Sequence, residues 1–119
     1  MKYLLLIYES EAGFAGMSGD EQARIFEEYM DYTKGIRKSG NYIGGEALQA
    51  ISTATTVRVK NGKTITTDGP FAETREQLGG FYLVEARDLD EAIKLAAGIP
   101  ASRTGSIEVR PIMPTPSVD

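Results

Sequence analysis

The sequence contains no cysteine and no histidine. The lack of cysteine excludes disulfides, thiolate metal sites and cysteine nucleophiles. The lack of histidine excludes Ser-His-Asp and Cys-His mechanisms and the usual zinc hydrolases. Any general acid or base must therefore be a carboxylate, a lysine or a tyrosine. Oxygen ligands could still hold a hard cation, but no spaced run of Asp and Asn resembles a calcium loop. We therefore predict no metal site and no cofactor.

The chain also lacks an excess of positive charge and any long apolar run. Its net charge is −4, so we do not expect a basic surface for nucleic acid. No segment is long enough to cross a bilayer, so no membrane association is predicted. The apolar residues 3–8 are followed at once by Glu9 and Glu11, which favours a buried strand over a secretion signal. We therefore expect a cytoplasmic protein.

The length and composition fit one globular unit. The chain has 119 residues, of which 41% are hydrophobic and 25% charged, which is enough to bury one continuous core. We predict a single domain over residues 1–113 and a flexible tail over residues 114–119.

Two fully apolar strands are predicted, one at the start of the chain and one in its second half, together with a long helix that follows the first strand. Residues 3–8 and 80–86 are apolar on both alternating faces, which is typical of strands covered on two sides. Residues 9–17 read as a loop, and Ser18 then begins a helix through a capping box that Gly40 ends. Its core-facing stripe is predicted to hold Ile25, Phe26, Tyr29, Thr33 and Ile36.

The middle of the chain carries the strongest turn signal. Residues 41–48 are expected to run extended and irregular, and residues 53–59 alternate like a strand. Asn61-Gly62 predicts a type I′ turn that folds residues 57–60 onto residues 63–66. A short helical turn is expected over residues 72–78.

The last part of the chain is predicted to hold a second helix and a final strand. Asp88 caps this helix, which should present Leu89, Ala92, Ile93, Ala96 and Ala97 on one side, and the strand follows at residues 106–112.

The order of these elements predicts an α+β fold. It is a ferredoxin-like βαββαβ arrangement with a β-hairpin added in the middle. Two helices cover only one face of such a sheet, whereas the strands are apolar on both faces. The other face would leave an apolar patch that monomers seldom tolerate, so we expect a homodimer.

Residues 67–82, read as TDGPFAETREQLGGFY, closely resemble the signature of the DGPF-motif branch of the YCII-related family. Further matching segments lie at residues 1–8, 45–48, 56–59, 90–92 and 107–111, in order along nearly the whole chain. The resemblance implies a dimeric α+β barrel, whose superfamily includes small isomerases, oxygenases and ligand-binding proteins. In the YCII branch the proposed site is a histidine and aspartate pair. Its aspartate corresponds to Asp68, but its histidine has no counterpart in this sequence.

The candidate site centres on Asp68. This residue is either a turn-forming residue or a catalytic acid or base facing a cleft. Arg58 is either an anion anchor for a substrate or, like Arg110, part of a structural ion pair with a sheet glutamate: Glu46, Glu85 or Glu108. The remaining substrate-binding candidates are Tyr8, Phe71 and Tyr82. Tyr8 and Tyr82, together with Tyr42, could line a pocket, but aromatic residues on strands more often belong to the core.

Three hypotheses for function follow. The first is a small-molecule enzyme that uses the Asp68 carboxylate in a pocket beside the DGPF segment. The second, motivated by the missing histidine, is a ligand-binding or regulatory dimer without catalysis that is linked to transcription control. The third is a module that binds a transcription regulator through its acidic surface. The sequence names no substrate and does not decide whether the protein is an enzyme.

Overall fold

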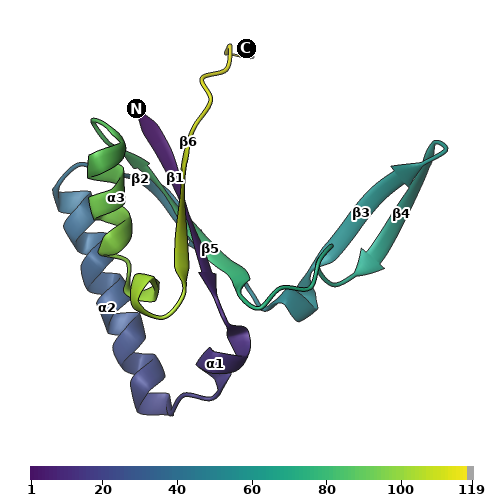
Figure 1. Ribbon diagram of the computed structural model, residues 1–119, viewed down its shortest axis with the longest axis horizontal. Helices are drawn as coiled ribbons and strands as arrows, with labels where there is room; N and C mark the ends of the chain where they lie inside the picture. Colours follow the sequence, from purple (N-terminus) through teal and green to yellow (C-terminus); the bar gives the residue numbers. More distant parts are fainter. Residues whose placement is uncertain (118–119) are drawn as a thin grey trace.

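Two apolar strands form the centre of a four-stranded antiparallel sheet. The computed structural model describes residues 1–117 (Figure 1). Strand β1 (Lys2–Glu9) pairs with β5 (Gln77–Glu85) on one side and with β6 (Ser106–Pro111) on the other. Strand β2 (Tyr42–Ala47) completes the order β2-β5-β1-β6. This order confirms the predicted ferredoxin-like α+β fold and places the two predicted apolar strands in the middle.

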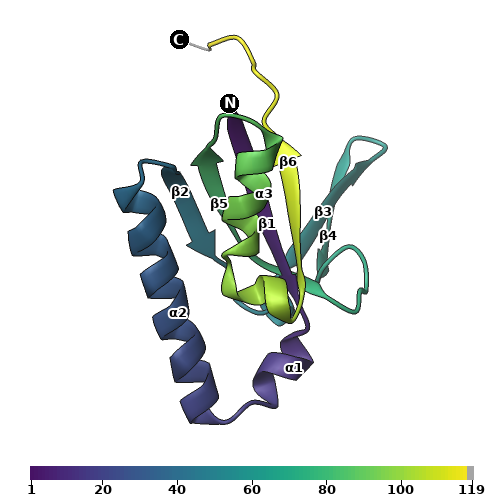
Figure 2. The same cartoon turned by 60° about the vertical axis from the view of Figure 1, so that its left-hand side comes forward.

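Two helices cover one face of this sheet. Helix α2 (Gly19–Lys38) and helix α3 (Leu89–Ala97) lie on the same side, as Figures 1 and 2 show. The 3-10 helix η2 (Pro100–Arg103) follows α3. The core lies between the helices and the sheet, and its buried residues are Tyr3, Leu5, Ile7, Ile36, Tyr82, Val84, Ala86, Ala92, Ala96, Ile99 and Ala101.

Both predicted helix caps are present. The Ser18 hydroxyl accepts a hydrogen bond from the Glu21 N–H at 3.2 Å, and the Asp88 carboxylate accepts one from the Glu91 N–H at 2.9 Å. Each bond satisfies one of the N–H groups that a helix leaves unpaired in its first turn. Gly40 lies just beyond α2 with a φ of 83°, the left-handed conformation that glycine tolerates after a helix.

The predicted helix stripes are too wide. On α2, Phe26 is exposed instead of facing the core, and on α3 Leu89 and Ile93 are each about half exposed. Helix α3 is short and packs on the sheet through Ala92 and Ala96. Because these small side chains bring the helix axis close to the sheet, the larger residues at the flanks of the stripe stay at the edge of the contact.

Three other sequence predictions need correction. The predicted loop over residues 9–17 contains a five-residue helix, α1 (Glu11–Ala15), which Ser10 caps by accepting from the Gly13 N–H. Residues 41–48 do not run irregularly, because β2 is a regular edge strand paired with β5 around one bulge. No helical turn forms at residues 72–78: residues 70–76 have no regular secondary structure, and Gln77 begins β5.

A β-hairpin projects from the body as a separate two-stranded sheet. A short 3-10 helix, η1 (Ile51–Thr53), leads into β3 (Thr55–Lys60), which pairs with β4 (Lys63–Asp68). The turn between them is the predicted one, since Asn61 and Gly62 have φ values of 51° and 76°. We call residues 55–68 the arm. Figure 1 shows the arm extending away from the sheet on the side opposite α2 and α3.

Within the predicted tail, residues 114–117 have no regular secondary structure, and residues 118–119 lie outside the described residues. None of the helices formed within residues 1–117 is long and apolar enough to cross a membrane.

Candidate functional site

One face of the four-stranded sheet carries no helix. Along β1 the side chains alternate: Tyr3, Leu5 and Ile7 are buried beneath the helices, whereas the residues between them point to the opposite face and are half-buried. The same alternation along β5 separates its buried from its half-buried residues. We call this second surface the open face. Its apolar centre consists of Leu4, Leu6, Tyr8, Phe81 and Leu83.

Charged residues border the open face. Glu46 lies opposite Phe81 on the edge strand β2, and Glu108 and Arg110 lie on the other edge strand, β6. All three are exposed. The predicted ion pairs of Arg58 and Arg110 with sheet glutamates do not form within residues 1–117, where Glu85 pairs instead with the N-terminal ammonium group at 3.0 Å. An apolar centre with a charged rim is the usual anatomy of a protein interface.

Asp68 stands at the base of the arm. It is the last residue of β4, lies opposite Thr55, and is exposed. The next residue, Gly69, has a φ of 95°; its N–H donates to the Ala54 carbonyl at 2.7 Å, and its carbonyl accepts from the Thr56 hydroxyl at 2.8 Å. The Asp68 carboxylate itself forms no hydrogen bond with any other residue in the described range. The turn is therefore held by Thr56 and the backbone, and the carboxylate is left free for another partner.

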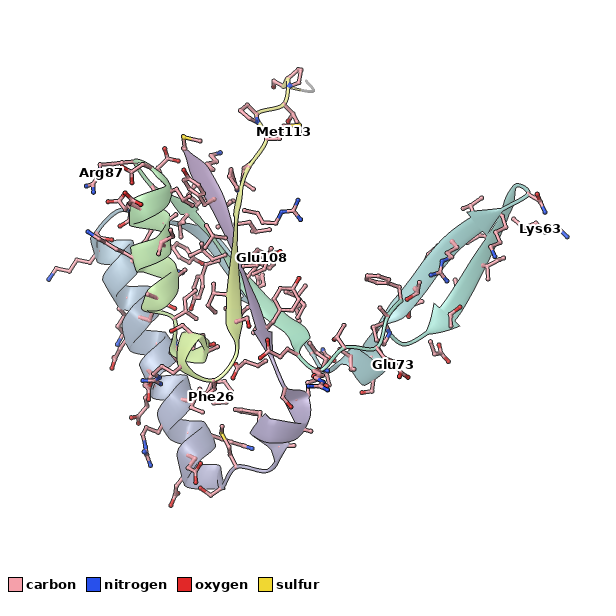
Figure 3. The ribbon with its side chains drawn as sticks, viewed as in Figure 1. Phe26, Lys63, Glu73, Arg87, Glu108 and Met113 are labelled. Carbon is pink, nitrogen blue, oxygen red and sulfur yellow. The ribbon has the colours of Figure 1, made fainter. Side chains whose placement is uncertain are left out.

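The segment after Asp68 is fixed at its far end. The Thr74 hydroxyl donates to the Glu76 carbonyl, and the Gln77 amide donates to the Thr74 carbonyl, both at 2.5 Å. Gln77 also accepts from the Glu11 N–H at 2.9 Å, which ties the segment to α1. Phe71 lies between the Gly69 turn and these anchors, with 79% of its surface exposed. Figure 3 shows the neighbouring Glu73 at the base of the arm. The segment therefore presents a large aromatic side chain next to a free carboxylate.

The five predicted site residues do not assemble within one chain. Arg58 lies halfway along the arm, opposite Ile65, and is exposed. Tyr8 is on the open face, whereas Tyr82 is on the helix face and only 8% exposed. Only Asp68 and Phe71 remain close along the chain. A site that used all five residues would need a second molecule to bring them together, and Tyr82 would still be on the wrong side of the sheet.

Tyr82 belongs to a group of aromatic residues inside the core. Its hydroxyl lies 2.7 Å from that of Thr33, and its ring contacts Tyr32 and Tyr42 edge to face, with ring centroids 5.3 and 6.4 Å away. The Tyr32 hydroxyl donates to the Leu95 carbonyl at 2.6 Å. Burial raises the pKa of Tyr82 above its usual value of 10, and it does the same for Tyr29 and Tyr32. These hydroxyls stay neutral and serve packing, which is the structural role left open for Tyr82.

Tyr32 and the contact of Thr33 with Tyr82 were not predicted from the sequence. The spacing of Tyr29, Tyr32 and Ile36 along α2 was the available signal, because residues three and four apart share one helix face. Arg37 extends this group at the surface, where its guanidinium lies 4.2 Å from the centre of the Tyr42 ring.

Two hollows on the described surface lie away from Asp68. The larger, of about 400 Å3, is lined by α2, the end of α3 and η2, and it includes Glu28 and Arg103. The smaller, of about 230 Å3, lies near Asn41 and Glu85. Neither contains Asp68, and residues 1–117 hold no cluster of carboxylates suited to a metal ion. Because Asp68 and Phe71 are both exposed, an enclosed site beside them would need walls supplied by another molecule.

The fold and this site define a small α+β domain with one uncovered apolar sheet face, and the comparisons place it in a family. The family model described as the YCII-related domain matches residues 1–116. The chain is also 37% identical over 114 residues to a protein of Rhizobium meliloti (strain 1021) described as "Uncharacterized protein R00369". That match covers 94% of this chain and 92% of the relative.

The chain belongs to the YCII-related family. This confirms the family that the residues at 67–82 indicated, while its DGPF-motif branch stays a prediction. The curated relative carries no assigned activity, so the function is argued from the geometry.

Proposed function

We propose that the protein acts as a homodimer that binds a small molecule beside Asp68, and that the Asp68 carboxylate serves there as an acid or base. The observation that carries the proposal is the open face. Five apolar residues at the centre of the sheet have no helix over them, although the opposite face is covered by two. Burial of apolar surface is the main favourable contribution to association, so this face is where a partner gains most.

A second copy of the chain suits this face. The rim carries both signs of charge, with Glu46 and Glu108 as acids and Arg110 as a base. A two-fold axis brings the same surface onto itself, so an acid of one copy can meet Arg110 of the other. Two sheets packed face to face lie about 10 Å apart and bury their inner side chains between them. The pair would thus cover both apolar centres at once.

The second copy would also supply what the single chain lacks at Asp68. The carboxylate forms no hydrogen bond or ion pair within residues 1–117, Phe71 is exposed in the same segment, and neither of the two hollows described above contains them. A neighbouring subunit would shield this segment from water, and shielding strengthens the interaction of a carboxylate with a ligand. Because the chain has no histidine, carboxylates are one of the few types of side chain that can act as an acid or base in it.

The catalytic role is tested by Asp68→Asn. The substitution keeps the size of the side chain and removes its ability to take up a proton. A library of small carboxylate and phosphate metabolites is first screened for thermal stabilisation of the wild-type dimer, and the hits are followed by mass spectrometry for conversion. We expect Asp68→Asn to retain fold and dimer and to lose conversion. Glu73→Gln, an exposed carboxylate in the same segment, should convert normally; unchanged conversion by Asp68→Asn would remove the catalytic role.

A second candidate function is binding without conversion. It is favoured by one specific observation, the exposure of Asp68 in a chain that has no histidine to pair with it. In that case a metabolite raises the unfolding temperature of the dimer, as any ligand that binds only the folded state does, and no product forms. A product peak in the same mass spectra would decide against this candidate.

A further inference from the structure

The arm has almost no contact with its own body along its length. Every residue of β3 and β4 is exposed except Thr56, which is half-buried. Val57 and Val59 are 59% and 67% exposed. An isolated two-stranded hairpin is at best marginally stable in water, because it has no layer against which to bury a face. The arm therefore needs a packing partner that the single chain does not provide.

The two faces of the arm differ in chemistry. Directly opposite residues of an antiparallel pair point to the same face. One face holds Val57 opposite Thr66 and Val59 opposite Thr64, and the single charged residue among its three pairs is Asp68, opposite Thr55 at the root of the arm. The other face holds Arg58 opposite Ile65 and Lys60 opposite Lys63. The arm thus offers an apolar β-branched surface on one side and three cations on the other.

The charge of the arm is opposite to that of the rest of the chain. The arm contains three cations and one acid, Asp68 at its root, so its net charge is +2, whereas the whole chain has a net charge of −4. The residues outside the arm therefore carry a net charge of −6. A basic extension on an acidic body is attracted to any other copy of that body, and charge complementarity of this kind directs association.

The arm and the open face lie on the same side of the molecule. Figures 1 and 2 show α2 and α3 on one side of the sheet and the arm on the other. Whatever packs on the open face is consequently the nearest neighbour of the arm. The same second copy is then in a position to contact both surfaces.

The size of the open face also calls for a further contact. Four strands about 4.8 Å apart, over about six residues of about 3.3 Å each, span about 400 Å2 in projection. Each partner of a stable interface buries about 800 Å2 of accessible surface. The accessible area is larger than the projected area because side chains stand out from the sheet. Even so, the open face alone is small for a stable dimer interface. The arm supplies additional area where the second copy must lie.

We propose that the β3–β4 arm of each subunit packs against the second subunit of the dimer, with the face that holds Val57 and Val59 at the contact and with the long side chains of Lys60 and Lys63, at the tip, reaching around the edges of the hairpin to the acidic surface of that subunit. The proposal rests on the homodimer proposed above and deepens it. It gives the arm the role of a clasp, and it places Asp68, at the root of the arm, next to the subunit boundary. A ligand beside Asp68 would then be enclosed by both copies.

Hydrogen exchange of the wild-type protein tests the clasp, with sedimentation velocity on the same sample. A free hairpin exchanges its amide hydrogens close to the rate of an unstructured chain. A packed arm should exchange residues 57–66 about 100-fold more slowly than that rate. A dimer with a protected arm supports the proposal. A dimer whose arm exchanges like an unstructured chain overturns the clasp and leaves the homodimer standing, whereas a lone subunit overturns both.

Charge reversal provides a second, independent test. Lys60→Glu combined with Lys63→Glu alters only exposed residues at the tip of the arm, so the fold is retained. The dimer dissociation constant should rise about tenfold or more, because attraction across the contact becomes repulsion. The matched control, Lys34→Glu with Lys94→Glu, makes the same change in net charge at exposed positions on α2 and α3 and should leave the constant nearly unchanged. Equal effects of the two pairs of substitutions would contradict the clasp, and so would no effect of the arm pair. An arm that binds a nucleic acid and not the second subunit would also give no effect on dimerisation.

Discussion

Glu46 and Glu108 lie at the two ends of a single row of side chains that crosses the four-stranded sheet. Between them in the same row are Phe81 and Leu6, each directly opposite its neighbour on the next strand. The row is therefore charged at the edges of the sheet and apolar in the middle. The apolar middle of the row gains free energy when it is removed from water, whereas its charged ends stay hydrated.

Replacing Leu6 by Glu should break the dimer. The new carboxylate would lie at the middle of the row, where the second sheet excludes water, and an unpaired charge buried there costs about 3 kcal/mol or more. That figure corresponds to roughly a 100-fold rise in the dimer dissociation constant. Sedimentation velocity over a concentration series measures the constant.

The matched control for this experiment is Ile93→Glu. Ile93 is an apolar residue on the outer side of α3, about half exposed, so the same change there should leave association nearly unaffected. If Ile93→Glu dissociates the subunits and Leu6→Glu does not, the interface lies on the helix side and the open face is not the contact.

A pair of glycine substitutions should have opposite effects on stability. A Cβ at Gly105 would overlap the carbonyl oxygen of Tyr8, because the chain after η2 passes directly over the end of β1. Gly105→Ala should therefore lower the free energy of unfolding by about 3 kcal/mol. Gly35, in the interior of α2, has no neighbour within 4 Å of such an atom, so Gly35→Ala should raise stability by up to about 1 kcal/mol. Urea unfolding at fixed protein concentration measures both changes. If Gly105→Ala left the free energy of unfolding unchanged, the chain could not pass as close to the Tyr8 carbonyl as described.

Alkaline pH should weaken the fold through the buried tyrosines. Burial raises the pKa of Tyr29, Tyr32 and Tyr82 above 10 in the folded chain. The stability that comes from keeping these phenols protonated is complete below pH 10, and it is lost as the pH rises above 10 towards the folded pKa values. Urea unfolding between pH 9 and about 11 should show this decline. Tyr32→Phe should make the decline shallower; an identical slope in the variant would exclude Tyr32 as a cause.

Removing either helix cap should destabilise the chain by a similar, modest amount. Ser18→Ala and Asp88→Ala each delete an oxygen that accepts from a first-turn N–H, and such losses cost about 1 kcal/mol. Ser102→Ala offers a control, because its hydroxyl donates to a carbonyl at the end of α3 and caps no N-terminus. Thermal unfolding at equal concentration compares the three variants, and caps that cost no more than the control would contradict the assignment of these helix starts.

Local chemistry explains which parts of the fold were predictable from sequence. The Ser18 and Asp88 caps and the Asn61-Gly62 turn depend on neighbours a few residues away, so their signals are complete in the sequence. The continuous apolar runs at residues 3–8 and 80–86 likewise indicate central strands. Helix α1 was missed because five residues give no periodicity, although Ser10 was a usable cap signal.

Competing local hydrogen bonds account for the failed helical turn at residues 72–78. There the Thr74 hydroxyl and the Gln77 amide bind nearby carbonyls in a non-helical conformation. Side chains of this kind offer the backbone an alternative to helix, and propensity alone does not show which alternative wins.

The candidate site was less predictable than the fold, because its geometry depends on contacts between distant segments. Alternation along the strands placed Tyr8 and Tyr82 in apolar strands but did not fix the register that puts them on opposite faces. The turn signal predicted a hairpin but said nothing of its direction, which decides whether Arg58 approaches Asp68. Asp68 and Phe71 came from the resemblance at residues 67–82, and the structure leaves both exposed.

The most direct test of the account is sedimentation velocity of the wild-type chain at micromolar concentration. The open face, uncovered by the two helices, predicts a single species with twice the 12.9 kDa mass of the chain. A stable species with the mass of one chain, unchanged as the concentration rises, would contradict the proposed dimer, and with it the shared site beside Asp68 and the clasp formed by the arm.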